Sequence, residues 1–199
     1  MIRLLTALVL TGCALALFPR ISQAQNNEEY DSIGELALSN DTLQLRYQND
    51  GDLFGMDDSI LSGAFFLSEE RDTVFSAGVG FPTGLPLGPV SLHVGPQVYA
   101  ALLNDENEDI LSIGVGAAAR WVVLSNLGLG IAGHAYYAPD ILTFGSADNL
   151  TDLMARVELG LQSRVLVFGG MRWFEFDLTE GEGERTLQEE VFVGFGYRF

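Results

Sequence analysis

The sequence predicts an all-β protein, a closed antiparallel β-barrel that spans a membrane, and three observations predict it. From residue 33 onward, most segments alternate apolar residues with small or polar ones, which is the period of a β-strand with two different faces. Several segments reach the roughly 9 to 11 residues that a tilted strand needs to cross a bilayer. The last segment alternates in the same way and ends on an aromatic residue, Phe199. The sheet must close on itself, because lipid cannot hydrogen-bond an open edge.

The first 24 residues are predicted to be a secretory signal peptide, so the barrel domain would cover residues 25–199. Arg3 precedes an apolar run, and a small residue stands at the expected cleavage position, Ala24. Export and removal of this segment would deliver the chain to the outer membrane. Lipoprotein cleavage at Cys13 is a competing interpretation, but the apolar run continues beyond that cysteine.

Ten alternating segments follow, separated by acidic residues or by Gly, Pro and Asn. They cover residues 33–39, 42–48, 59–68, 73–81, 89–102, 109–121, 127–138, 150–162, 164–177 and 187–199. A barrel entered from the periplasm needs an even number of strands to return the chain to that side. We prefer ten strands, because residues 42–48 alternate cleanly, and eight strands starting at residue 59 remain the alternative.

The segments differ in what their two faces carry. The first two form a predicted hairpin through Asn40 and Asp41. The fifth to seventh have continuous rows of Leu, Val, Ile and Ala on one face and many glycines on the other. The eighth to tenth carry charges on the face opposite the apolar one. A soluble barrel would bury the apolar row, and a membrane barrel turns it to lipid.

Charged residues on the inward face are predicted to pair across a narrow lumen, since an unpaired buried ion costs several kcal/mol. We expect Arg172 and Glu158 to belong to one coupled network. Its predicted members are Arg46, Arg120, Arg156, Glu158, Arg172, Glu190 and Arg198. A barrel of about eight strands is filled by side chains, so a plugged polar lumen is expected. The inward glycines remove volume, and a narrow channel for small solutes or ions is therefore the alternative.

Two sets of outward residues have predicted roles at the membrane. The last strand is interpreted as the signal read by the barrel-assembly machinery, through Val191, Val193, Phe195, Tyr197 and Phe199. Three aromatic residues near strand ends are predicted to form an interfacial girdle, Trp121, Tyr137 and Trp173. The expected partners are accordingly outer-membrane lipid and lipopolysaccharide, and the barrel is expected to be a monomer.

The connections alternate in kind along the chain. Those at 69–72, 103–108, 139–149 and 178–186 are acidic, whereas those at 82–88, 122–126 and 162–164 lack acids. The sequence therefore predicts that the acids lie at one end of the barrel. Because outer-membrane barrels place their longer loops outside, that end is predicted to be extracellular.

Composition excludes several classes of function. A formal net charge of −17 leaves no basic surface for nucleic acid. The only cysteine lies in the predicted signal peptide, and no cofactor or metal motif is present. The two histidines, His93 and His134, are interpreted as hydrogen-bonded packing residues. A lipid-modifying enzyme that uses one of them as a base is the third hypothesis, after a structural or envelope-interaction barrel and a channel.

Five short, glycine-rich or aromatic motifs mark the chain. They are YYAPDIL at 136–142, GVGF at 78–81, GPV at 88–90, GGMRW at 169–173 and the terminal GFGYRF. In these motifs the mature chain resembles the YfaZ family of Gram-negative envelope proteins over most of its length. One departure is Met171, where an aromatic residue would be expected before the arginine. The resemblance implies an envelope or outer-membrane location and carries over no catalytic residues.

Overall fold

The computed structural model describes residues 32–85, 87–104, 108–161, 164–178 and 183–199. The predicted signal peptide and Cys13 lie outside the described residues. Within these ranges, no helix is long and apolar enough to cross a membrane.

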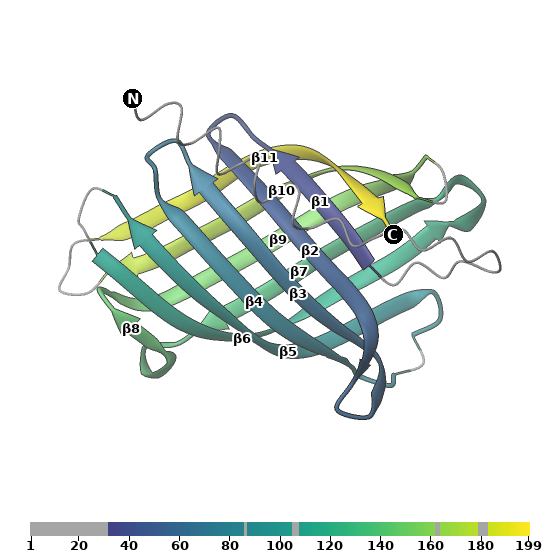
Figure 1. The fold of residues 1–199 in the computed structure, drawn as a ribbon, viewed down its shortest axis with the longest axis horizontal. Helices are drawn as coiled ribbons and strands as arrows, with labels where there is room; N and C mark the ends of the chain where they lie inside the picture. The colour runs from purple at the N-terminus through teal and green to yellow at the C-terminus, as the bar shows by residue number, and fades with distance from the viewer. Residues whose placement is uncertain (1–31, 86, 105–107, 162–163, 179–182) are drawn as a thin grey trace.

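Ten long strands form one closed antiparallel barrel (Figure 1). They are β1 (Ser32–Leu38), β2 (Thr42–Leu53), β3 (Met56–Ser68), β4 (Thr73–Pro82), β5 (Val90–Leu103), β6 (Glu108–Leu124), β7 (Leu129–Ala138), β9 (Ala147–Gly160), β10 (Val165–Leu178) and β11 (Glu184–Arg198). Pairing of β1 with β11 joins the first long strand to the last, and consecutive long strands pair around the rest of the wall. The predicted fold class and the preferred count of ten strands are confirmed.

The two ends of the barrel differ in what they carry. We call the end where β1 begins and β11 finishes the terminal end, and the opposite end the loop end. Ile33 pairs with Arg198 at the terminal end, so the first and last long strands meet there. Figure 1 shows the yellow C-terminal end beside the start of β1. This arrangement is the one that an even number of strands requires.

Two stretches predicted to be connections are strands instead. An additional short strand, β8 (Thr143–Gly145), pairs with Ile110–Ser112 of β6, beyond the point where β7 stops pairing with β6. It supplies hydrogen-bond partners to an edge that would otherwise have none. The hairpin of β2 and β3 is also longer than predicted, because the pairing continues to Leu53 and Met56. Phe54 and Gly55 both have positive φ and form its two-residue turn.

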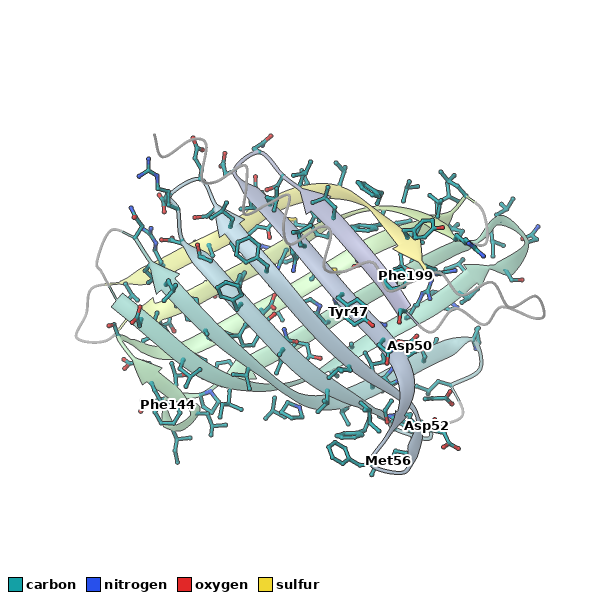
Figure 2. The ribbon with its side chains drawn as sticks, viewed as in Figure 1. Tyr47, Asp50, Asp52, Met56, Phe144 and Phe199 are labelled. Atoms are coloured by element: carbon teal, nitrogen blue, oxygen red, sulfur yellow. The ribbon has the colours of Figure 1, made fainter. Side chains whose placement is uncertain are left out.

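This longer hairpin corrects the predicted distribution of acidic residues. Its turn lies at the terminal end, and it carries Asp50, Asp52, Asp57 and Asp58. Figure 2 shows Asp50 and Asp52 on this hairpin, far from Phe144 of β8. The expectation that the acids lie at one end is therefore wrong. Clean alternation in the sequence ends at residue 48, so it does not show at which end the acids beyond that residue lie.

The two faces of the wall have opposite exposure, as the alternation predicts. Outward valines are open, with Val115 59% and Val193 67% exposed, whereas the inward Tyr99 is 1% exposed. Antiparallel register places opposed residues on the same face, so one outward residue fixes the facing of its neighbours. The apolar residues therefore form the outside of the barrel, which is the arrangement suited to lipid.

The interior is divided into two halves along the axis. The half toward the loop end is an apolar cluster of buried side chains, which we call the apolar plug: Phe66, Val74, Tyr99, Ala101, Leu103, Ile110, Ala138, Ala147, Leu150, Phe174, Phe176, Leu178 and Leu187. The half toward the terminal end holds most of the charges. The predicted polar lumen is therefore wrong for the loop half. Inward apolar side chains of that half meet one another across a narrow lumen, and their burial stabilises the interior as it would a soluble core.

Inward glycines make room for the large residues of this interior. A Cβ at Gly116 would lie 2.1 Å from the carbonyl oxygen of Ala135 and 2.6 Å from the ring of Tyr136. A Cβ at Gly170 would lie 2.7 Å from the Cβ of Arg156. The glycines thus allow side chains from adjacent strands to cross in front of the backbone, so the volume they release is filled locally.

Candidate functional site

A buried carboxylate, Asp152 of β9, organises the middle of the barrel. It is fully buried and accepts hydrogen bonds from two nitrogens of Arg172, at 2.8 and 2.9 Å. The hydroxyl of Tyr99 donates a hydrogen bond to Oδ2 of the same carboxylate at 3.0 Å. A ring nitrogen of His134 lies 3.2 Å from Oδ1 of the same carboxylate. Four strands, β5, β7, β9 and β10, are therefore joined through one side chain.

The Arg172 guanidinium borders the apolar plug on the side that faces the terminal end. Its Cζ lies 4.3 Å from the ring centroid of Phe174 and 5.4 Å from that of Phe66. Such contacts with aromatic faces stabilise a desolvated cation. The Nη1 atom of Arg172 has no hydrogen-bond partner among the described residues. A cavity of about 10 Å³ is lined by Arg172 together with His134 and Arg46, which is room for about one water molecule.

A second charge network lies nearer the terminal end, around Arg156 of β9. Arg156 donates to both oxygens of Glu35 on β1, at 2.8 and 2.7 Å, and its Nε donates to Oε1 of Glu158 at 2.9 Å. Arg120 of β6 donates from Nε to the other oxygen of Glu158 at 2.8 Å. The Arg156 guanidinium also lies 4.4 Å from the ring centroid of Phe168. All four oxygens of the two glutamates are thus engaged by arginine.

The structure separates the predicted network into different groups. Glu158 pairs with Arg156 and Arg120, whereas Arg172 pairs with Asp152, so the expected coupling of Arg172 with Glu158 corresponds to no direct contact. The reason is axial position. The register places Glu158 opposite Phe168, four residues along β10 from Arg172.

Three further members of the predicted set have other surroundings. Glu190 of β11 accepts a hydrogen bond from the hydroxyl of Ser39 in the β1–β2 turn. Arg46 and Arg198 line an open part of the lumen, and within the described ranges neither has a carboxylate within 4 Å. They therefore add positive charge to the lumen without forming ion pairs there.

Sequence reasoning missed three residues that hold these networks together, Glu35, Tyr99 and Asp152. Tyr99 is an inward residue, but the predicted charge network does not include it. Asp152 has the same strand phase as the predicted inward Arg156, which it precedes by four positions. That phase could have identified Asp152. The partners of these residues could not be identified, because Glu35 and Arg156 are 121 residues apart in the chain.

An open cavity occupies the lumen between the Arg156 network and the terminal end. Its volume is about 160 Å³. Ser32, Ser91 and Arg198 line it at the ends of their strands, so it reaches the terminal rim. Toward the loop end the cavity extends as far as His134, which lies on the terminal-end side of the apolar plug.

The histidines do not form a recognisable catalytic arrangement. His134 contacts Asp152, but a substrate could not reach the pair. Only 8% of the His134 side chain is exposed, and the carboxylate of Asp152 is fully buried. His93 lies at the terminal end, where its Nε2 is 2.9 Å from the carbonyl oxygen of Asp58. Across the part of the chain with described coordinates, no group of three or more His, Cys, Asp or Glu side chains is placed to hold a metal ion.

At the loop end, an ion-pair cluster lies above the apolar plug. Arg185 of β11 contacts Asp72 at 2.8 Å and Glu70 at 2.7 Å, both from the β3–β4 turn. The carboxylate of Asp72 also accepts a hydrogen bond from the backbone of Asn104 at 3.0 Å. The cluster ties the β3–β4 turn to β11 and to the start of the β5–β6 connection across the barrel mouth.

The residues with predicted membrane roles lie on the outer surface. The predicted assembly residues of β11 are exposed on one face of the strand: Val191, Val193, Phe195, Tyr197 and Phe199. The ring of Phe199 stacks with Tyr47 of β2 at 6.2 Å between centroids, and Figure 2 shows the two side by side. The predicted girdle residues are also exposed, with Trp121 toward the terminal end and Tyr137 and Trp173 toward the loop end.

Comparison with known proteins gives the family. The model of the family described as "YfaZ precursor" matches residues 14–199. Outer membrane protein YfaZ of Escherichia coli (strain K12) is 26% identical over 155 residues, which cover 77% of this chain and 83% of that protein.

Among solved structures, a bacterial polysaccharide outer membrane secretin matches with a TM-score of 0.50 and 12% identity. The match covers 85% of this chain, which spans just under two thirds, 65%, of that structure. At this identity the likeness concerns the fold alone. The ten-stranded barrel, its apolar outer surface and the match of nearly the whole chain lead to one conclusion: this chain belongs to the YfaZ family and is an outer-membrane β-barrel protein.

Proposed function

We propose that this protein is a monomeric, non-conducting outer-membrane barrel that acts through its outer surface and loops as a structural or envelope-interaction element. The observation that carries the proposal is the apolar plug. Phe174 and Leu150 in its centre are 1% and 0% exposed, so solvent reaches them from neither end. An ion crossing this half would have to displace packed apolar side chains and lose its water, which is strongly unfavourable.

The outer surface supports the proposed partners. The exposed apolar residues would contact outer-membrane lipid and lipopolysaccharide, and the exposed face of β11 would be read by the barrel-assembly machinery. In the proposed orientation the terminal end faces the periplasm and the loop end faces outward. No catalytic step is proposed, because both histidines are engaged in hydrogen bonds that need no substrate.

Electrical recording tests the proposal against the narrow-channel alternative. The purified protein is reconstituted in a planar lipid bilayer after its folding has been verified by heat-modifiable migration on a detergent gel. We expect no steady single-channel steps. A variant with Phe174→Ala and Phe176→Ala, verified in the same way, tests whether opening the plug allows current. Steady steps from the unaltered protein would overturn the proposal in favour of a channel.

A further inference from the structure

The cavity at the terminal end has an unusual set of charged walls for a protein with a formal net charge of −17. Four arginines line it, Arg46, Arg120, Arg156 and Arg198, together with three carboxylates, Glu35, Glu158 and Asp50. The wall therefore carries more cationic than anionic side chains. Its volume of about 160 Å³ exceeds what one water molecule needs, and a small organic or inorganic anion would fit.

The hydrogen bonds determine which arginines remain available to a ligand. Arg156 is fully used, since its nitrogens contact both Glu35 and Glu158. Among the described residues Arg120 contacts a carboxylate through its Nε alone, on Glu158, and 45% of its side chain is exposed. Asp50 accepts a hydrogen bond from the amide of Gln48 at 2.9 Å.

Three guanidinium groups are consequently left with free donors, those of Arg46, Arg120 and Arg198. Arg46 and Arg198 have no ion pair with any described carboxylate, and both glutamates of the wall are saturated. A planar guanidinium presents paired N–H donors that match the oxygens of phosphate and carboxylate groups. Like charges that converge on one cavity repel each other, and an anion between them would relieve that repulsion.

We propose that this cavity is a binding site for a small oxyanion, a phosphate or carboxylate group that enters from the terminal end. The apolar plug closes the other end, so the ligand binds in a chamber and leaves as it entered. Arg46, Arg120 and Arg198 supply the free donors, and the Arg156 network forms the fixed floor that holds Arg120 in place. The site does not depend on whether the barrel conducts, since binding and current are measured separately.

Titration of the folded barrel with inorganic phosphate tests the site. Isothermal titration calorimetry on the detergent-refolded protein should detect saturable binding at low ionic strength. The double variant Arg46→Gln/Arg198→Gln removes two guanidinium charges and breaks no ion pair among the described residues, so it should fold normally. We expect its phosphate affinity to fall by at least about tenfold, the loss of one charge-assisted hydrogen bond or more.

The matched control is Arg71→Gln, which removes one charge from the exposed turn between β3 and β4 at the loop end. Its phosphate affinity should stay within about twofold of the unaltered protein, because exposed charges are screened. Phosphate should also raise the unfolding midpoint of the unaltered barrel and leave that of the double variant unchanged. No saturable binding by the folded protein, or an equal loss in the control, would overturn the proposal.

A lipid headgroup could supply the same chemistry as free phosphate. Phosphate titrations in phosphatidylcholine vesicles with and without phosphatidylglycerol separate the two sources. Competition by phosphatidylglycerol would identify a headgroup as the occupant, and undiminished phosphate binding would identify a free anion. Either result upholds the site, provided the double variant has lost it.

Discussion

The carboxylate of Asp152 is the side chain whose removal the structure predicts to be most costly. Asp152→Asn preserves the shape of the side chain and removes its charge. Two charge-assisted hydrogen bonds from Arg172 are then weakened, and each is worth about 1.5 to 3 kcal/mol. The Arg172 guanidinium would remain buried without a counter-ion. The expected loss of unfolding free energy is therefore about 3 to 5 kcal/mol, the usual cost of breaking a buried pair.

The assay is urea unfolding of the barrel in lipid vesicles, with folded and unfolded chains separated by heat-modifiable migration. Asp140→Asn is the matched control, because it makes the same chemical change at an exposed position of the loop end. The control should shift the unfolding free energy by less than about 0.5 kcal/mol.

A second variant distinguishes an unpaired charge from lost packing. Replacing both partners, in Asp152→Asn/Arg172→Met, removes the unpaired charge together with its counter-ion. The double variant should therefore be less destabilised than the two single changes added together. If Asp152→Asn proves as stable as Asp140→Asn, or if the two changes are additive, the network does not hold the barrel together and the reasoning fails.

Three further outcomes are expected. Val115→Arg puts a charge on the lipid face and should reduce stability in vesicles by about 2 to 4 kcal/mol, whereas Ile141→Arg in the exposed loop should be tolerated. Equal stability of the two variants would contradict the assignment of Val115 to the lipid-facing side of the wall. Phe199→Ala should lower the amount of folded barrel in the outer membrane of cells but not spontaneous refolding in vesicles, and Phe144→Ala, an exposed aromatic of the loop end, should lower neither. Gly116→Ala should cost about 1 to 3 kcal/mol in urea unfolding, because its Cβ would lie 2.1 Å from a backbone oxygen of the next strand; an unchanged midpoint would show that the wall can shift.

The paired charges of the lumen mark the limit of sequence reasoning for this protein. The inward positions of Arg156, Glu158 and Arg172 follow from period two, because a one-residue error would turn every side chain to lipid. Their partners do not follow. Arg172 meets Asp152 as a diagonal neighbour on the paired strand β9, whereas Arg156 of β9 meets Glu35 of β1 across strands that are not paired, which requires the closed and staggered wall.

The apolar plug was missed for a related reason. Phe174 and Phe176 alternate with outward residues as polar lumen residues would, and alternation reports only which face a residue occupies. Whether an inward phenylalanine borders water or other side chains depends on what projects from the opposite wall. In the closed barrel, Phe66 of β3 meets Phe174 of β10, with ring centroids 5.7 Å apart.

The sequence by itself predicted which face of each strand contacts lipid and that the number of strands is even, with ten preferred over eight, because lipid imposes a strict alternation that can be read locally. Only the tertiary structure decided which arginines are neutralised and which face an open cavity. That outcome depends on distances across the lumen, which bring together residues as far apart in the chain as Glu35 and Arg156. No local pattern in the chain encodes those distances, because closure and stagger set them for the barrel as a whole.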